Sequence, residues 1–224
     1  YGIFNNLDLF HFSMDLRPVA LAVVSCVVSG KSLAQAKKEV ALQFGLSVIP
    51  TNIELLTQLT DEERREYSFL LTKPMRTLSG VAPIAVMTKP FGCPHGKCTF
   101  CPGGPGSPFG DVPQSYTGHE PSAMRAARAG YDPYLIVFNR LEQYMLLSQV
   151  PEKAEVILQG GTFPAYDVSY QEQTVAFILK ALNDFSSLFF FTGEFDFVAF
   201  KDFFCLPGRV DDAERAAKVR SKVL

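Results

Sequence analysis

In the first third of the chain, apolar residues recur at the spacing of amphipathic helices. An apolar segment over 17–29 carries Pro18 in its first turn, where proline is well tolerated. Two capping boxes mark further helix starts, Ser32–Gln35 and Thr60–Glu63. Gly45 is placed to end the first of these helices, and Lys73-Pro74 lies beyond the second. The pattern predicts an N-terminal helical domain over residues 1–72.

A different pattern begins at residue 73. The segments 81–87 and 154–158 are short, apolar and β-branched, which predicts buried strands. Between them, helices are expected after Glu120-Pro121 and after Asp132-Pro133, the second with Tyr134, Phe138, Leu141 and Met145 inward. A further helix over 171–182 is expected to bury Val175, Ile178, Leu179 and Leu182. The order predicts an α/β domain over 73–224 with parallel strands.

The last part of the chain is rich in phenylalanine. Residues 188–205 contain eight phenylalanines among scattered charges, and residues 211–224 have the pattern of a charged helix. Aromatic surface of this kind is rarely left in water. We therefore expect it to need a partner or further chain.

The charge distribution and the cysteine content indicate possible binding partners and the cellular location. The net charge is −2, yet residues 67–110 contain no Asp or Glu and include Lys73, Arg76, Lys89 and Lys97. This run is either a set of solvated cations or a surface for phosphate groups. Five cysteines, three of them bunched, argue against a disulfide framework and for a reducing, cytoplasmic location. The apolar run 19–28 is too short to cross a membrane.

The bunched thiols are Cys93, Cys98 and Cys101, in a loop too rich in Gly and Pro for regular structure. Zinc would need a fourth ligand, for which His95, His119 or Cys205 are candidates. A plant-type ferredoxin centre would take Cys205 as a distant fourth thiolate. In a third interpretation, three thiolates hold a 4Fe–4S cluster and leave one iron open for S-adenosylmethionine.

A glycine pair favours the third interpretation. Gly160 and Gly161 follow the second predicted strand directly, and glycine lets the backbone approach a ligand closely. Ligands of parallel β/α folds bind at the carboxyl ends of the strands. The cysteine loop follows the first strand, so both features are expected at the same edge.

Several runs together resemble the catalytic subunit of Elongator and its archaeal and bacterial homologues, which are radical S-adenosylmethionine enzymes that act on tRNA. They are KPMRTLSGV (73–81), MTKP (87–90), CPHGKCTFCPGGP (93–105), PQSYTGHEPSAMRAARAGYDPY (113–134) and GGTF (160–163). The resemblance covers about residues 30–185. It implies an N-terminal tRNA-binding region, a partial TIM-like (β/α)6 barrel and a C-terminal acetyltransferase domain.

The resemblance also implies roles for single residues. Cys93, Cys98 and Cys101 would ligate the 4Fe–4S cluster, Gly160, Gly161 and Thr162 would bind S-adenosylmethionine, and Lys153 would contact acetyl-CoA. In the family, a 5′-deoxyadenosyl radical activates acetyl-CoA, and the wobble uridine of tRNA gains a carboxymethyl group at its C5 atom. Candidates for tRNA contact are Lys73, Arg76, Lys89, Lys97, Arg125 and Arg128, with Tyr116 and Tyr131 for base stacking.

The chain departs from the family in two respects. Gln159 stands before the glycine pair, where an apolar residue is expected. Only 123 residues follow Cys101, enough for about two of six barrel strands. We therefore expect an N-terminal part that is inactive alone or depends on self-association or further Elongator-type subunits. The alternative is a non-catalytic RNA-binding module stabilised by a metal or cluster.

Overall fold

The computed structural model describes residues 15–70, 77, 79–147, 149–204, 206, 217 and 221. The chain divides into two compact units, residues 1–72 and 73–224. Lys73, Arg76, Cys205 and most of the predicted helix over 211–224 lie outside the described residues. Within the described part of the chain, no helix combines the length and apolarity needed to cross a membrane.

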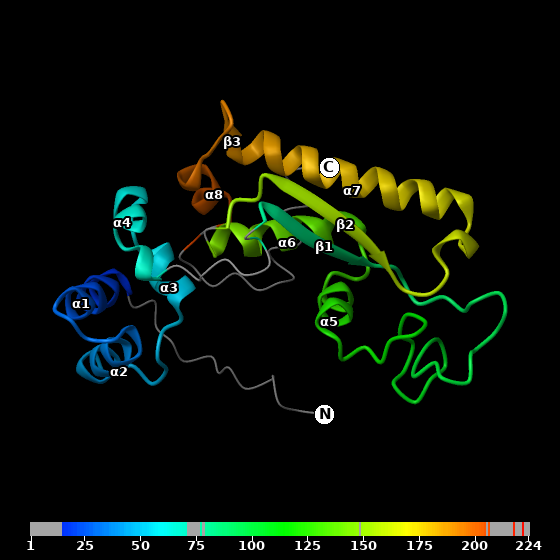
Figure 1. The fold of residues 1–224 in the computed structure, drawn as a ribbon, viewed down its shortest axis with the longest axis horizontal. Coiled ribbons are helices and arrows are strands. Elements are labelled where there is room, and N and C mark those ends of the chain that lie inside the picture. Colours follow the sequence, from blue (N-terminus) through cyan, green and yellow to red (C-terminus); the bar gives the residue numbers. More distant parts are fainter. Residues whose placement is uncertain are drawn as a thin grey trace. The chain divides into compact units, whose positions relative to one another are not determined.

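The first unit is helical (Figure 1). It contains α1 (Arg17–Val28), α2 (Leu33–Gln43), α3 (Asn52–Thr57), α4 (Asp61–Glu66) and a 3-10 turn at Ser68–Leu70. The three predicted helices are present, and α3 is an addition whose start carries a further capping box, Thr51 with Glu54. The unit buries an aliphatic core that includes Val19, Val23, Ala36, Val40, Leu55, Leu56, Leu59 and Leu70.

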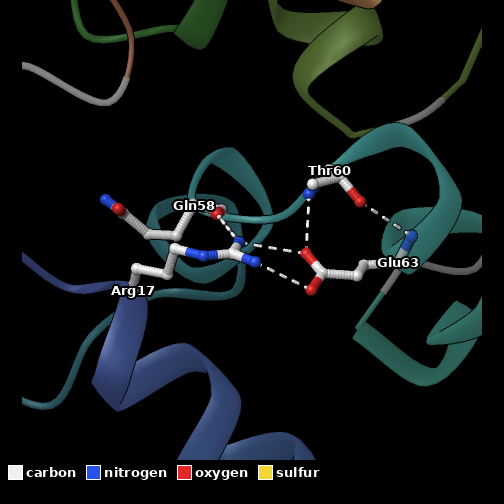
Figure 2. Close-up of polar contacts among 4 residues, drawn as sticks. All are labelled: Arg17, Gln58, Thr60 and Glu63. Carbon is white, nitrogen blue, oxygen red and sulfur yellow. Dashed lines mark hydrogen bonds and ion pairs between the residues drawn. The ribbon is translucent and has the colours of Figure 1, made fainter.

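An arginine clamp joins two helices of this unit (Figure 2). Arg17, the first residue of α1, donates two hydrogen bonds to the Glu63 carboxylate, at 2.9 and 3.0 Å. It donates a third to the Gln58 carbonyl at 2.7 Å. Glu63 also accepts the Thr60 N–H at 2.8 Å, which completes the predicted capping box of α4. One carboxylate therefore caps α4 and ties it to α1.

The second unit has the predicted α/β order (Figure 1). It contains β1 (Val81–Met87), α5 (Pro121–Arg128), α6 (Pro133–Leu146), β2 (Lys153–Gln159), a 3-10 turn at Phe163–Ala165 and α7 (Val168–Phe189). The strands pair in parallel, from Val81 opposite Lys153 to Met87 opposite Gln159. These two strands make up the described parallel sheet. The mixed α/β class is confirmed, whereas the larger TIM-like barrel stays a prediction.

One face of this sheet is covered and the other is open. Ala82, Ile84 and Val86 of β1 are fully buried in a core shared with α5 and α6. On β2, the exposed residues Lys153, Glu155 and Ile157 alternate with half-buried ones. This alternation is typical of a strand that buries one side only.

The inner face of α7 differs from the prediction. Ile178 is buried as expected, but Val175 and Leu179 are 44% and 54% exposed, so those two assignments are wrong. The buried positions are Thr174, Ile178, Ala181, Phe185 and Phe189. They repeat at helical spacing along the face that packs on α6, and this rotates the apolar stripe away from Val175 and Leu179.

The phenylalanine-rich segment folds largely onto the unit itself, while its need for a partner stays a prediction. A short hairpin of β3 (Phe190–Phe191) and β4 (Glu194–Phe195) reverses the chain, and α8 (Phe197–Phe204) folds back on α7. Five of the eight phenylalanines are buried, Phe189, Phe197, Phe200, Phe203 and Phe204. Most of them pack edge-to-face or tilted on each other and on Phe138 and Phe185, whereas Phe197 and Phe200 are stacked. The unit therefore covers most of its aromatic surface itself.

Candidate functional site

A cavity of about 550 Å³ lies at the carboxyl ends of β1 and β2. The cysteine loop, which follows β1, and the glycine turn, which follows β2, both contribute to its lining. All six residues predicted for the cluster and S-adenosylmethionine line it, Cys93, Cys98, Cys101, Gly160, Gly161 and Thr162. Its volume lies in the range of small-molecule and cofactor sites, roughly 300–1,000 Å³.

The glycine turn is close-packed at Gly160. The residue has φ +108°, which L side chains rarely adopt. A Cβ atom here would lie 2.5 Å from the Thr88 Oγ1 atom and 3.3 Å from the Met87 sulfur. Only glycine satisfies both the conformation and the space. The turn also reaches the cysteine loop directly, because Thr162 Oγ1 donates to Cys93 Sγ at 3.5 Å.

Cys101 has the most polar surroundings of the three thiols. Its sulfur accepts a hydrogen bond from Gln114 Nε2 at 2.9 Å and lies 3.5 Å from Ser115 Oγ. The Ser115 hydroxyl, followed by Gln114 and neighbouring backbone groups, lowers the pKa of the Cys101 thiol against the opposing effect of burial. Metals bind the thiolate form, so these contacts favour a ligand role. Sequence reasoning missed Gln114 and Ser115, although both lie in the run 113–134.

The thiols lie around one cavity without being gathered together. Cys98 Sγ is 3.4 Å from His95 Nε2, while Cys93 contacts Thr162 and Cys101 contacts Gln114. Among the described residues, no group of three or more Cys, His, Asp or Glu side chains is close enough to hold a metal ion. The donor set fits a thiolate-bound iron–sulfur group by chemistry, since three thiols share one cavity and one has a lowered pKa.

The alternative zinc ligands are separated in the structure. His95 lines the cavity beside Cys98, whereas the His119 ring packs against the Phe109 ring in a T-shaped arrangement, with the ring centroids 6.1 Å apart. Cys205 lies outside the described residues. A four-ligand zinc site is therefore not assembled from the described candidates.

Other predicted residues lie away from the cavity lining. Lys153 begins β2, at the strand end opposite to Gly160, so it is roughly 20 Å from the turn. Arg125 and Arg128 occupy the last turn of α5. Lys97 is exposed within the cysteine loop, and the Lys89 ammonium lies 4.5 Å over the Tyr170 ring.

The two stacking candidates divide in the same way. Tyr116 lines the cavity, whereas Tyr131 follows α5 at φ +58° and packs against the hydrophobic core.

Comparison with known proteins gives the relationship. Residues 14–78 match the model of the ELP3 N-terminal domain. The chain is 52% identical to the tRNA uridine(34) acetyltransferase of Methanocaldococcus jannaschii over 142 residues, which are 62% of this chain and 26% of that protein. The chain belongs to the Elongator complex protein 3 family.

Further family members are similar over much the same share of the chain. The tRNA uridine(34) acetyltransferase of Methanocaldococcus infernus is 46% identical over 69% of this chain and 29% of its own length. Elongator complex protein 3 of Danio rerio is 38% identical over 78% of the chain and 33% of its own length. The chain thus spans about a quarter to a third of these relatives.

Proposed function

We propose that this chain is part of a radical S-adenosylmethionine enzyme that uses acetyl-CoA to modify the wobble uridine of tRNA. The observation that supports this most is the shared cavity. Three thiols and a Gly-Gly-Thr turn, separated by about one βαβ unit in sequence, line the same space at the carboxyl ends of parallel strands. Two relatives are tRNA uridine(34) acetyltransferases, which supports the wobble uridine of tRNA as the substrate and acetyl transfer chemistry as the class of reaction.

In this proposal Cys93, Cys98 and Cys101 hold a 4Fe–4S cluster. When bound, the cluster and S-adenosylmethionine supply one-electron chemistry that amino-acid side chains lack. The chain contributes the thiolate ligands and fixes their positions. Gln114 and Ser115 favour the ionised form of Cys101.

The glycine turn is the proposed binding site of S-adenosylmethionine. Gly161 is exposed and presents backbone without a side chain toward the cavity, and a Cβ here would lie 3.7 Å from Cys93 Sγ. A ligand at the turn would therefore be adjacent to a cluster-holding thiol. Thr162 adds a hydroxyl that can bond to either.

Substrate contacts complete the proposal. We propose that Lys97, which is exposed between Gly96 and Cys98, contacts a phosphate group near the cavity, and that Tyr116, which lines the cavity, stacks on a base. Lys73, Arg76, Lys89, Arg125 and Arg128 remain candidates for further tRNA contact, and Lys153 for acetyl-CoA. Since the chain spans a quarter to a third of its relatives, the whole reaction belongs to the proposal.

The test is cleavage of S-adenosylmethionine. The chain is reconstituted anaerobically with iron and sulfide, reduced with dithionite, and assayed for release of 5′-deoxyadenosine. Although the chain alone is expected not to modify tRNA, cleavage needs only the residues that line the cavity, so we expect release by the wild type. We expect it also from Cys26→Ala, whose cysteine packs on the core of the first unit. Release should be lost in Cys101→Ala. Bound iron without release in the wild type would contradict the proposal. Bound zinc with tRNA affinity and no release would favour an RNA-binding module.

A further inference from the structure

A buried tyrosine joins the two loops that form the cavity without lining it. Tyr166 follows the 3-10 turn at Phe163–Ala165 and is 5% exposed. Its hydroxyl lies 2.8 Å from Thr88 Oγ1 and donates to the Lys89 carbonyl at 2.7 Å. Both partners belong to the first two residues after β1. The phenol therefore contacts the start of the cysteine loop from the chain that follows the glycine turn.

Thr88 extends the same contact to the glycine turn. Its hydroxyl is 3.1 Å from both the Gln159 and the Gly160 carbonyl oxygens. The hydroxyls of Thr88 and Tyr166 contact each other and three backbone carbonyl oxygens in all. Only two hydroxyl protons are available for these contacts. Loss of either hydroxyl leaves buried carbonyl groups with fewer donors, which is costly at buried positions.

A stack of three rings reinforces this connection. Tyr166 lies between Phe91 and Tyr170, with ring centroids 4.4 and 4.8 Å away. The Tyr170 hydroxyl accepts the Lys89 N–H at 3.1 Å. Phe91 precedes Cys93 by two residues, and Cys93 in turn meets Thr162. The stack thus holds the backbone that leads into the first thiol.

We propose that Tyr166, acting with Thr88, is a positioning residue that sets the place of the Cys93 end of the cysteine loop relative to the Gly160–Thr162 turn. This rests on the proposed function for its consequence, because the two loops are the proposed cluster and S-adenosylmethionine sites. Neither Tyr166 nor Thr88 lines the cavity. Their effect would be on the fit between the two loops, not on direct contact with a ligand.

The first readout needs no cofactor. Amide hydrogen exchange is measured on the 224-residue chain and on Tyr166→Phe. We expect exchange in segments 88–93 and 159–163 to rise about tenfold, because a buried hydrogen bond that closes these loops is lost. Tyr144→Phe is the matched control, since Tyr144 is equally buried and its hydroxyl donates to the Pro83 carbonyl at 2.8 Å within β1. It should leave the two segments unchanged.

The second readout is binding to the reconstituted chain. Tyr166→Phe and Thr88→Val should keep the iron content of the wild type and bind S-adenosylmethionine about tenfold more weakly. Thr88→Ser restores the hydroxyl and should restore the affinity. If Tyr166 affected affinity only through the stability of the unit, Tyr144→Phe would lower affinity and stability in parallel as well.

The outcomes separate the two ideas. Unchanged exchange in Tyr166→Phe, or unchanged affinity while the wild type binds S-adenosylmethionine, would overturn the positioning role. A wild type that binds neither iron nor S-adenosylmethionine would refute the proposed function. In that case the exchange data alone still decide whether Tyr166 holds the loops together.

Discussion

The Thr162 hydroxyl donates to the Cys93 sulfur at 3.5 Å, across 69 residues of sequence. The parallel register explains this contact. Met87 and Gln159 are paired at the ends of β1 and β2, so the segments that follow them leave the sheet at the same edge. A change in the glycine turn is therefore expected to act on the cysteine loop as well.

Gly160→Ala should destabilise the second unit by about 3 kcal/mol, through backbone strain at φ +108° and overlap with the Thr88 hydroxyl. Gly130→Ala provides the comparison, because Gly130 has φ +61° and open space around its Cβ position. It should cost about 1 kcal/mol, from strain alone. Urea unfolding measures both. Equal losses would show that the turn is not close-packed at Gly160.

Glu63→Gln should weaken the first unit in a pH-dependent way. The hydrogen bond from Arg17, followed by that from the Thr60 N–H, lowers the pKa of the Glu63 carboxyl in the folded state. A lowered pKa stabilises the fold above the unfolded value of about 4.3, and this is lost as the pH falls through the folded value. The difference in urea midpoint between wild type and variant should thus be largest near neutral pH and shrink below about pH 4.

Glu62→Gln is the matched control for this prediction. Glu62 is the exposed neighbour of Glu63 in α4 and takes no part in the arginine clamp. Glu62→Gln removes the same charge as Glu63→Gln but leaves the clamp intact. The difference in urea midpoint from the wild type should therefore be smaller and flatter across the same pH range. A Glu63→Gln profile that runs parallel to the Glu62→Gln profile would count against the clamp.

Phe189→Ala should lower the free energy of unfolding of the second unit by roughly 3–5 kcal/mol, because a fully buried aromatic side chain leaves a cavity. Phe191→Ala, two residues further on and 57% exposed, should change it by less than about 0.5 kcal/mol. Both are measured by urea unfolding of the whole chain. A small effect of Phe189→Ala would count against this packing and favour the prediction that the segment needs a partner.

Local sequence signals predicted much of this fold. The strand at 81–87 matches β1, and the Thr60–Glu63 capping box forms at the start of α4. These features depend on residues close in sequence, so spacing alone reveals them. The parallel pairing of β1 with β2 also followed, because the helices between them are long enough for a crossover.

Features that depend on distant contacts were harder to predict. The buried face of α7 is set by its packing on α6, and the burial of Phe200 depends on a hairpin that returns the chain to α7. At the site, Gln114 and Tyr166 act through partners 13 and 78 residues away. No local pattern marks such partners, although the cysteine spacing and the glycine pair predicted six of the residues that line the cavity.

The most direct test of the account is the iron and acid-labile sulfide content of the chain after anaerobic reconstitution. A 4Fe–4S cluster on three thiolates predicts about four iron atoms per chain, lost in Cys93→Ala, Cys98→Ala and Cys101→Ala and kept in Cys205→Ala. Loss of iron in Cys205→Ala would indicate a four-thiolate centre instead. Zinc, or no metal, in the wild type would contradict the cluster and with it the proposed function.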